Sequence, residues 1–239
     1  MKVQVWSDIM CPFCYIAKKN FDKALADSPF KNEVEIEWKS FQLDPALKEN
    51  SGKVSISEYF MERKGFSEPH LKQFQQQLAE MGEAAGITFN QHTTIAAETF
   101  TAHKLLHLAK EHNKSDEMEE VLFEAHFTNG KNIADVDFLI ASAEQIGLDR
   151  EKAGAVLMDD TYNYEVKQDI MEAQNLGISG VPYYLFDNKH AVSGAQSVEF
   201  FTRTLQQAYR ESTVSPIPSA DGNACGTDGC SIQDDDKKC

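Results

Sequence analysis

The sequence predicts an α/β fold in which a long helical segment interrupts a strand-containing domain. Three observations lead to this prediction: alternating segments flank a helical pattern near the N-terminus, a long central stretch has helical periodicity, and two more strand patterns and a helix follow it. The chain has 239 residues and is 41% hydrophobic. That length allows one domain with a substantial insertion, and that composition allows a real core.

The first half of the predicted domain is a strand, a helix and a second strand. Residues 2–7 alternate polar and apolar side chains, a pattern typical of a short strand. From Pro12 to Ala26 apolar residues recur at helical spacing, and a proline in the first helical turn costs no hydrogen bond. Residues 33–41 alternate again and predict the second strand. Strand, helix, strand is half of a thioredoxin-type unit.

The stretch from residue 55 to residue 160 has almost wholly helical periodicity, so we expect a large all-helical insertion. We interpret Gly86, Gly130 and Gly147 as helix stops. The helices predicted for this insertion cover residues 68–85, 96–112, 116–127, 136–146 and 150–158.

The second half of the thioredoxin-type unit follows the insertion. Residues 161–176 predict a helix, and Gly177 closes it as a left-handed cap. Residues 181–186 and 190–193 predict two strands joined by an Asp-Asn turn, and residues 197–209 predict a closing amphipathic helix.

The apolar periodicity stops after Glu211, where Ser, Pro, Gly, Asp and Asn dominate. We therefore expect a flexible, cysteine-containing tail over residues 211–239. The remaining chain divides into a thioredoxin-like domain over residues 1–54 and 161–210 and the helical insertion over residues 55–160.

Charge and cysteine content restrict the class of protein. The net charge is -15, which argues against nucleic acid and anionic membrane partners because both bind clustered Lys and Arg. The first residues lack the apolar run of a signal peptide, and no stretch approaches the roughly 20 apolar residues of a membrane span, so we expect a cytoplasmic protein. In a reducing compartment, paired cysteines indicate redox chemistry or metal binding more than structural disulfides.

The segment Cys11-Pro12-Phe13-Cys14 lies where the first predicted strand ends and the first predicted helix begins. A thiolate attacks disulfides, and the N-terminus of a helix stabilises an anion, so Cys11 is the predicted nucleophile. Cys14, one turn further into the helix, would resolve the mixed disulfide. The alternative is half of a zinc site, which needs a second ligand pair that the sequence does not offer nearby. We expect neither a metal nor a cofactor.

The Gly180-Val181-Pro182 turn is the second predicted element of the site. Proline is unusual at the start of a buried strand, and a cis bond between Val181 and Pro182 would explain it. An ordinary trans turn is the alternative. In the cis geometry, the backbone of Val181 could pair with an extended substrate and present its cysteine to Cys11.

Four segments together resemble the FrnE subgroup of the DsbA-like oxidoreductases, in matching order over about residues 1–210. Residues 7–15 read Ser-Asp-Ile-Met-Cys-Pro-Phe-Cys-Tyr, residues 102–107 read Ala-His-Lys-Leu-Leu-His, residues 180–182 read Gly-Val-Pro and residues 192–196 read Val-Ser-Gly-Ala-Gln. The resemblance implies a thioredoxin fold with a helical insertion, a redox-active cysteine pair and a cis-proline that faces it. It also implies that His103 lines the groove near the dithiol.

Related kappa-class glutathione transferases and chromene-carboxylate isomerases carry Ser where this chain has Cys11, so both cysteines together favour dithiol chemistry. The chain departs from the family at Glu98-Thr99, where Asn-Thr is common, and at Tyr183, where Phe or Thr is common. Both departures leave the dithiol untouched and put substrate preference in doubt.

Cys225 and Cys230 lie in the predicted tail, with two glycines between them that would let a disulfide close. We hypothesise an auxiliary redox pair that exchanges electrons with the dithiol or guards it against over-oxidation. Incidental exposed thiols carry about equal weight. A third alternative is a metal clasp with Cys239, which would lack a fourth ligand.

Several other side chains are weaker candidates. His103 and His107 share a helical face and could bind metal, but packing is the favoured interpretation. Asp8 is a proton acceptor or a cap of the first strand. Phe13 is a candidate for substrate binding, because together with Tyr183 and Tyr184 it could form an apolar rim, although such aromatic residues are as often core.

The sequence therefore predicts a cytoplasmic thiol-disulfide oxidoreductase or isomerase that acts on protein or peptide thiols and disulfides. Glutathione or a thioredoxin-type protein is the candidate reductant. Two alternatives stay open: a glutathione-dependent transferase or isomerase that uses Cys11 in place of serine, and a chaperone-like binding module that uses the groove of the insertion.

Overall fold

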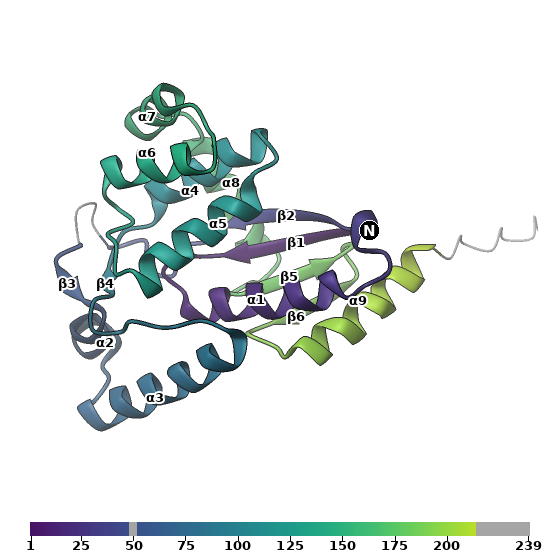
Figure 1. Cartoon of the computed structure of the whole chain (residues 1–239), viewed down its shortest axis with the longest axis horizontal. Coiled ribbons are helices and arrows are strands. Elements are labelled where there is room, and N and C mark those ends of the chain that lie inside the picture. Colours follow the sequence, from purple (N-terminus) through teal and green to yellow (C-terminus); the bar gives the residue numbers. More distant parts are fainter. Residues whose placement is uncertain (48–51, 214–239) are drawn as a thin grey trace, which may run out of the picture.

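A four-stranded mixed sheet lies at the centre of the fold, in the order β2-β1-β5-β6 (Figure 1). The computed structural model describes residues 1–47 and 52–213. The first two strands run parallel, because a helix crosses over between them, and the other two pairs are antiparallel. The strands are β1 (Lys2–Ser7), β2 (Glu35–Ser40), β5 (Tyr183–Phe186) and β6 (His190–Ser193).

Helices α1 (Pro12–Ala26) and α9 (Val198–Thr213) lie side by side against one face of the sheet (Figure 1). The apolar stripe of each helix packs with one set of alternating strand residues, and Val5, Phe21 and Phe201 are fully buried there. The opposite face of the sheet is therefore free for other helices.

Helix α8 (Asn163–Asn175) covers the other face of the sheet. Trp6 points to this face because it follows Val5 in the strand, and it packs with Ala173 and Ile178. The indole N–H of Trp6 donates a hydrogen bond to the carbonyl oxygen of Asp169 at 3.1 Å. The α8 helix is thus fastened to the central strand by both apolar and polar contacts.

The insertion packs its helices around a core cluster that also contains both cysteines of the Cys-Pro-Phe-Cys segment. The predicted domain division at residues 54 and 160 stays a prediction, because this single cluster runs across it. The helices of the insertion are α2 (Ile56–Lys64), α3 (Glu68–Ala85), α4 (Phe100–Glu111), α5 (Ser115–Phe123), the π-helical segment η2 (Glu124–Thr128), α6 (Val136–Gln145) and α7 (Arg150–Met158).

The insertion is not wholly helical, which corrects one part of the sequence prediction. Strands β3 (Val54–Ser55) and β4 (Ile95–Ala96) form a two-stranded antiparallel sheet. Helix α4 consequently begins at Phe100, four residues later than predicted, where the carboxylate of Glu98 accepts the backbone N–H of Phe100. Two-residue strands are too short to produce a periodic pattern.

Two further helices also differ from the prediction. Helix α2 was missed, although Ser55 and Glu58 form a capping box and Gly65 closes the helix in a left-handed conformation with φ of 71°. Helix α9 runs to Thr213, so residues 211–213 of the predicted tail are helical. Tyr209 anchors this end, since its ring stacks on Phe30 with 3.9 Å between the ring centroids.

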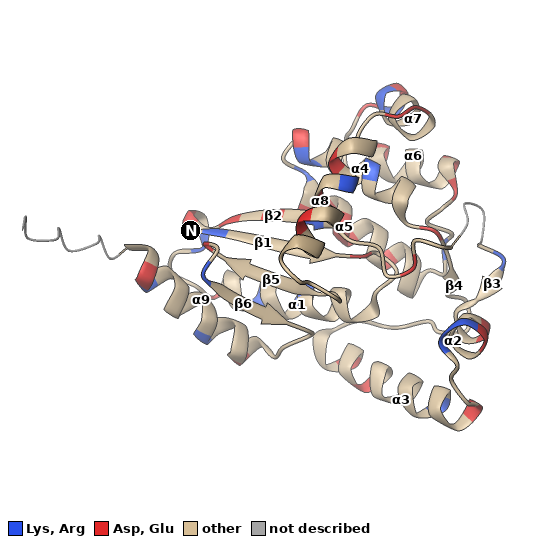
Figure 2. Cartoon of the chain, turned by 180° about the vertical axis from the view of Figure 1, so that it is seen from behind, with Lys and Arg blue, Asp and Glu red and all other residues tan. Residues whose placement is uncertain are grey.

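Charged residues of both signs share the surface of the fold. Seen from behind, Lys and Arg are interspersed with Asp and Glu along the helices (Figure 2). Within residues 1–47 and 52–213, none of the helices combines the length and the apolar character that a bilayer crossing requires.

Candidate active site

The Cys-Pro-Phe-Cys segment forms the first turn of α1, as predicted. Cys11 is the N-cap residue, with extended backbone angles of -93° and 109°, and Pro12 occupies the first helical turn. The N–H of Cys11 donates to the carbonyl oxygen of Asp8 at 2.8 Å, and the N–H of Cys14 donates to the carbonyl oxygen of Cys11 at 3.0 Å. These bonds fix the sulfur of Cys11 at the N-terminus of the helix, where anions are stabilised.

A loop from the far end of the chain faces this turn. The thiol of Cys11 donates to the carbonyl oxygen of Val181, with 3.5 Å between sulfur and oxygen. The peptide bond between Val181 and Pro182 is cis, as expected from its position before β5. The structure therefore brings together two segments that are 170 residues apart.

The two cysteines are free thiols in different environments. Cys11 is 3% exposed and Cys14 is 1% exposed. Burial raises the pKa of Cys14 well above its usual value, the hydrogen bond and charge of Cys11 raise it further, and the Asp8 backbone and the Ser7 hydroxyl oppose the shift. Cys14 is thus held as a neutral thiol that only an adjacent group can reach.

Aromatic side chains surround the dithiol, but not all of those predicted for the rim. Phe13 is half-buried and meets Phe74 edge to face, with 6.0 Å between centroids. Tyr184 is fully buried against Phe21 instead, so it belongs to the core of the sheet. A small apolar pocket of about 20 Å³ adjoins the dithiol, lined by Met10, Pro12, Ile56, Phe60, Phe74, Leu78, Phe89 and Phe127, with Gln75, Gln91 and Thr94.

Four buried titratable residues form a group around the carboxylate of Asp8, whose charge acts on the other three. We call Asp8, His103, Glu119 and His126 the dithiol cluster; all four are almost completely shielded from solvent. The carboxylate of Asp8 accepts the backbone N–H of Leu43 at 2.7 Å and lies 3.8 Å from Nε2 of His103. His103 therefore lies behind the dithiol and does not line an open groove, which corrects the role implied by the resemblance.

Three members of the dithiol cluster, His103, Glu119 and His126, have shifted pKa values. Burial raises the pKa of Glu119 to about 8, against the opposing charge of His103. Burial lowers the pKa of His126 to about 4. For His103, burial acts to lower the pKa, but the hydrogen bond and charge of Asp8 outweigh it and raise the pKa. Glu119 and His126 are therefore neutral near neutral pH.

Glu119 and His126 were missed as site residues. They lie seven residues apart, and together with Leu122 and Phe123 they occupy one buried helical face. A carboxyl group and an imidazole on an otherwise apolar stripe are the signal that could have found them.

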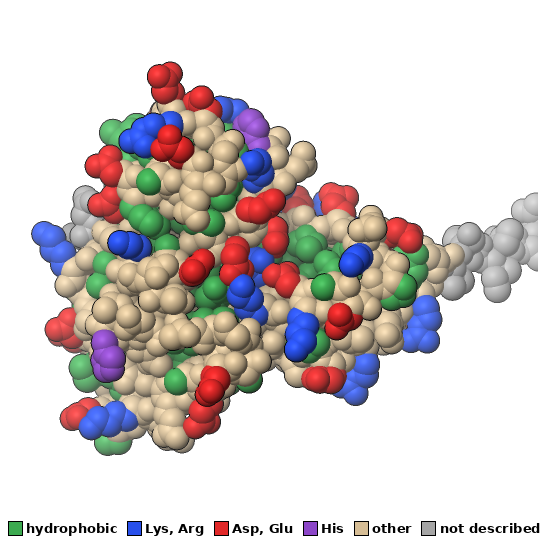
Figure 3. Space-filling model, in the orientation of Figure 1, with side chains coloured by type: hydrophobic (Ala, Val, Ile, Leu, Met, Phe, Trp, Pro, Cys, Tyr) green, Lys and Arg blue, Asp and Glu red, His purple; other side chains and the backbone are tan. Residues whose placement is uncertain are grey.

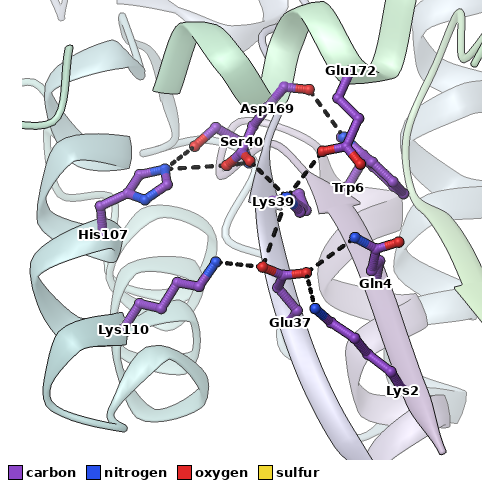
Figure 4. Close-up of polar contacts among 10 residues, drawn as sticks. All are labelled: Lys2, Gln4, Trp6, Glu37, Lys39, Ser40, His107, Lys110, Asp169 and Glu172. Carbon is purple, nitrogen blue, oxygen red and sulfur yellow. Dashed lines mark hydrogen bonds and ion pairs between the residues drawn. The ribbon is translucent and has the colours of Figure 1, made fainter. Parts of the chain in front are cut away.

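The second histidine of α4 belongs to a different polar group. Nε2 of His107 lies 3.1 Å from the carboxylate of Asp169 and 3.3 Å from Oγ of Ser40 (Figure 4). Because His103 and His107 face different partners, the two do not form a shared metal site. Within the described ranges, three or more His, Cys, Asp or Glu side chains nowhere converge as metal ligands.

This second group, which we call the β2–α8 network, joins strand β2 to helices α4 and α8 (Figure 4). Its members are Glu37, Lys39, Ser40, His107, Lys110, Asp169 and Glu172, with Lys2 and Gln4 of β1.

Cys225 and Cys230, the predicted auxiliary redox pair, lie outside the described residues, as does Cys239.

Comparison with known proteins assigns the chain to a family. The family described as the DSBA-like thioredoxin domain matches residues 2–206. The chain belongs to this family. The resemblance to DsbA-like oxidoreductases is thereby confirmed, as is the thioredoxin-type fold with its helical insertion, and members of the family are generally disulfide oxidoreductases or isomerases. Assignment to the FrnE subgroup stays a prediction.

Individual relatives agree with the family assignment. A crystal structure titled "probable DsbA oxidoreductase SCO1869" from Streptomyces coelicolor is 35% identical, has a TM-score of 0.84, and the match covers 98% of this chain and 99% of that one. The uncharacterized protein YwbO of Bacillus subtilis (strain 168) is 28% identical over 218 residues, covering 87% of this chain and 98% of the relative.

The cytosolic disulfide reductase DsbM from Pseudomonas aeruginosa is a more distant structural neighbour. It has a TM-score of 0.62 at 14% identity, and the match covers 88% of this chain and 100% of that one. At this identity the likeness shows the fold alone.

Proposed function

We propose that this DsbA-like protein is a dithiol oxidoreductase or isomerase of protein and peptide disulfides, with Cys11 as nucleophile and Cys14 as resolving thiol. The observation that carries the proposal is the position of the Cys11 sulfur, at the first turn of α1 and 3.5 Å from the carbonyl oxygen of Val181. Cys14 lies behind it, buried and close enough to couple to it.

The first step of the reaction forms a mixed disulfide. The Cys11 thiolate attacks one sulfur of a substrate disulfide, the new sulfur–sulfur bond forms, and the other substrate sulfur leaves as a thiolate. The helix N-terminus favours the attacking anion.

The second step releases the substrate. Cys14 gives up its proton and attacks the sulfur of Cys11, so the second substrate sulfur leaves as a thiolate and takes up a proton. The substrate has then gained two electrons and the dithiol has become a disulfide. Because burial raises the pKa of Cys14, this thiol stays protonated until the mixed disulfide is next to it.

Val181 gives the substrate its orientation. Its carbonyl oxygen accepts the Cys11 thiol in the reduced protein and is half-buried. An N–H of an extended substrate can replace that thiol as donor, with Pro182 and Phe13 shaping the ends of the contact.

We further propose that the protein works as a reductase or isomerase in the cytoplasm and is regenerated by glutathione or a thioredoxin-type protein. The fold-level likeness to DsbM, a cytosolic disulfide reductase also solved with GSH, supports this direction. Under the same proposal, Cys225 and Cys230 exchange electrons with the dithiol, so removal of residues 214–239 should change turnover or peroxide sensitivity.

The decisive test compares two single cysteine variants in an insulin-reduction assay. Cys14→Ser should accumulate a mixed disulfide with its substrate and lose turnover, because no thiol resolves the intermediate. Cys11→Ser, the matched control, should trap nothing. Undiminished turnover in Cys14→Ser would instead favour a glutathione-dependent transferase or isomerase, and client binding that survives alkylation of Cys11 would favour a binding module.

A further inference from the structure

The outer edge of strand β2 presents backbone groups that no other strand pairs with. Strand β2 lies at one end of the sheet. The N–H of Glu35 donates to the carbonyl oxygen of Met1, so odd-numbered residues of β2 turn their backbone toward β1. Ile36 and Trp38 must therefore turn theirs outward, and within residues 1–47 and 52–213 neither N–H has a hydrogen-bond partner.

The same edge is closed further along the strand. The N–H of Ser40 also points outward, and it donates to the carboxylate of Asp169 on α8 at 3.0 Å. Lys39 beside it binds Glu172 at 2.9 Å (Figure 4). Helix α8 thus occupies the edge at one end and leaves the part from Glu35 to Trp38 open.

A groove of about 350 Å³ follows the open part of the edge. Four consecutive residues, 35–38, line it, and because successive side chains of a strand point to opposite faces, the groove must run along the edge of the sheet. Figure 3 shows acidic side chains gathered in the hollow between the insertion and the sheet. The opposite wall, at the junction of α4 and α5, consists of Lys110, Asn113, Ser115, Asp116 and Glu117.

The groove has an unbalanced negative charge. Glu37 is paired with Lys110 at 2.6 Å, and Asp116 is paired with Lys18 at 3.0 Å. Glu35 on the strand and Glu117 on the opposite wall have no ion-pair partner in the described part of the chain. The groove is therefore lined by two carboxylates that no ion pair in the described part of the chain compensates.

Trp38 adds an unused donor to the groove. It is 5% exposed and lines the groove, and its buried indole Nε1 has no hydrogen-bond acceptor among the described residues.

We propose that this groove binds an extended segment of a partner protein in which basic residues alternate with apolar ones, added to β2 as a fifth strand of the sheet. The outward backbone groups of Ile36 and Trp38 supply the main-chain bonds. Alternate side chains of the segment then meet the carboxylate of Glu35 on one face and the apolar residues Ile36 and Trp38 on the other, and Glu117 lies on the facing wall of the groove.

A second copy of this chain fits the groove poorly. Pairing of two β2 edges would bring Glu35 and Glu117 of both copies together, and like charges across a strand pair are destabilising. The site is also independent of the dithiol, since β2 reaches the active site only through the segment after Ser40.

The test uses the full-length protein and a fluorescent probe with the sequence acetyl-Lys-Val-Lys-Val-Lys-amide. We expect saturable, salt-sensitive binding by fluorescence anisotropy and no binding of the matched Glu-Val-Glu-Val-Glu peptide. Amide hydrogen exchange should slow at Ile36 and Trp38 on addition of the probe, while Glu37, which already faces β1, should not change.

Charge-reversal variants separate specific binding from general attraction to an acidic protein. The double variant Glu35→Lys with Glu117→Lys should bind the probe at least about tenfold more weakly. The matched pair Glu83→Lys with Glu151→Lys, on exposed helix surfaces elsewhere, should change it by less than about twofold.

Strand addition has its own control. A strand added to β2 forms hydrogen bonds through one of its two edges, and the N–H groups of the lysines point to one edge while those of the valines point to the other. N-methylation of one of these two sets of residues should therefore abolish binding, and N-methylation of the other set should leave it intact. Equal loss in both charge-reversal pairs, unchanged exchange at Ile36 and Trp38, binding of both methylated probes, or concentration-dependent dimerisation through this edge would each overturn the proposal.

Discussion

The dithiol cluster and the β2–α8 network contain the same kinds of residue, yet they differ in how completely they are hydrogen-bonded. In the network, the Asp169 carboxylate is approached by Ser40, Lys39 and His107, all within 3.1 Å (Figure 4). In the dithiol cluster, one carboxylate oxygen of Glu119 and both ring nitrogens of His126 lack partners among the described residues.

This difference in hydrogen bonding distinguishes a structural role from a functional one. A fully bonded polar network rigidifies the packing of the elements it joins, and here it ties β2 to α4 and α8. An incompletely bonded set of buried titratable groups costs stability, so it persists where a function needs it. The second description fits Asp8, His103, Glu119 and His126.

The largest effect is expected where the bonded network is broken. Asp169→Ala leaves the buried N–H of Ser40 without an acceptor and removes a carboxylate that also binds Lys39 and His107, which should cost about 3–5 kcal/mol. The midpoint of thermal unfolding should fall by on the order of 10 °C. As control, Glu172→Ala removes a more exposed partner of Lys39 and should cost less than about 1 kcal/mol. Equal losses would show that the network does not fasten the helices.

Glu119→Gln should stabilise the protein increasingly as the pH rises. The folded-state pKa of Glu119 is about 8 and its ordinary value is 4.5, so between these values only the unfolded chain loses the proton. The free energy of unfolding of the wild type then falls by up to about 1.4 kcal/mol for each unit by which the pH rises, and that of the variant does not. Urea unfolding at several pH values measures this slope. Glu117→Gln, on an exposed position of the same helix, should stay within about 0.5 kcal/mol of the wild type throughout.

His126→Phe should change stability in the opposite direction along the pH scale. The folded-state pKa of about 4 lies below the ordinary 6.5, so in that interval only the unfolded chain takes up a proton. The contribution of His126 to the free energy of unfolding is therefore complete above pH 6.5, and it falls by up to about 1.4 kcal/mol per unit as the pH drops through this interval. The His126→Phe variant should not show this loss of stability at acidic pH. If the free energy of unfolding of Glu119→Gln and of His126→Phe depends on pH in the same way as that of the wild type, Glu119 and His126 are better solvated than their burial indicates.

How much of this could be predicted from sequence depends on whether the signal is local. Helix α3 was predicted to the residue, because Pro69 near its start and Gly86 at its end mark both boundaries. Strands β3 and β4 were not predicted, since two residues carry no period and their pairing is fixed by contact between distant segments. Helix α5 ends in the π-helical segment η2, where a regular helix was expected.

The site divides in the same way. Cys11, Cys14 and Pro182 were found because each sits in a short motif whose chemistry depends on neighbouring residues. The partners of His103 and His107 were not found, because Asp8 and Asp169 come from other elements and meet the histidines only in the folded chain. A search for carboxylates on the same helix could not have identified them.

The smallest effect is expected at the solvent side of the β2–α8 network. Burial acts to raise the pKa of Glu37, but hydrogen bonds from Lys110, Lys2 and Gln4 outweigh it and lower the pKa from 4.5 to about 2. Its contribution is therefore present above pH 4.5 and is lost as the pH falls toward 2. Glu37→Gln should cost no more than about 1 kcal/mol at pH 7, because solvent and salt screen this partly exposed group. The cost should shrink at acidic pH and at high salt; a cost that is the same at pH 3 and pH 7 would mean that packing of the Glu37 side chain, and not its charge, holds Lys110 of α4 to the strand.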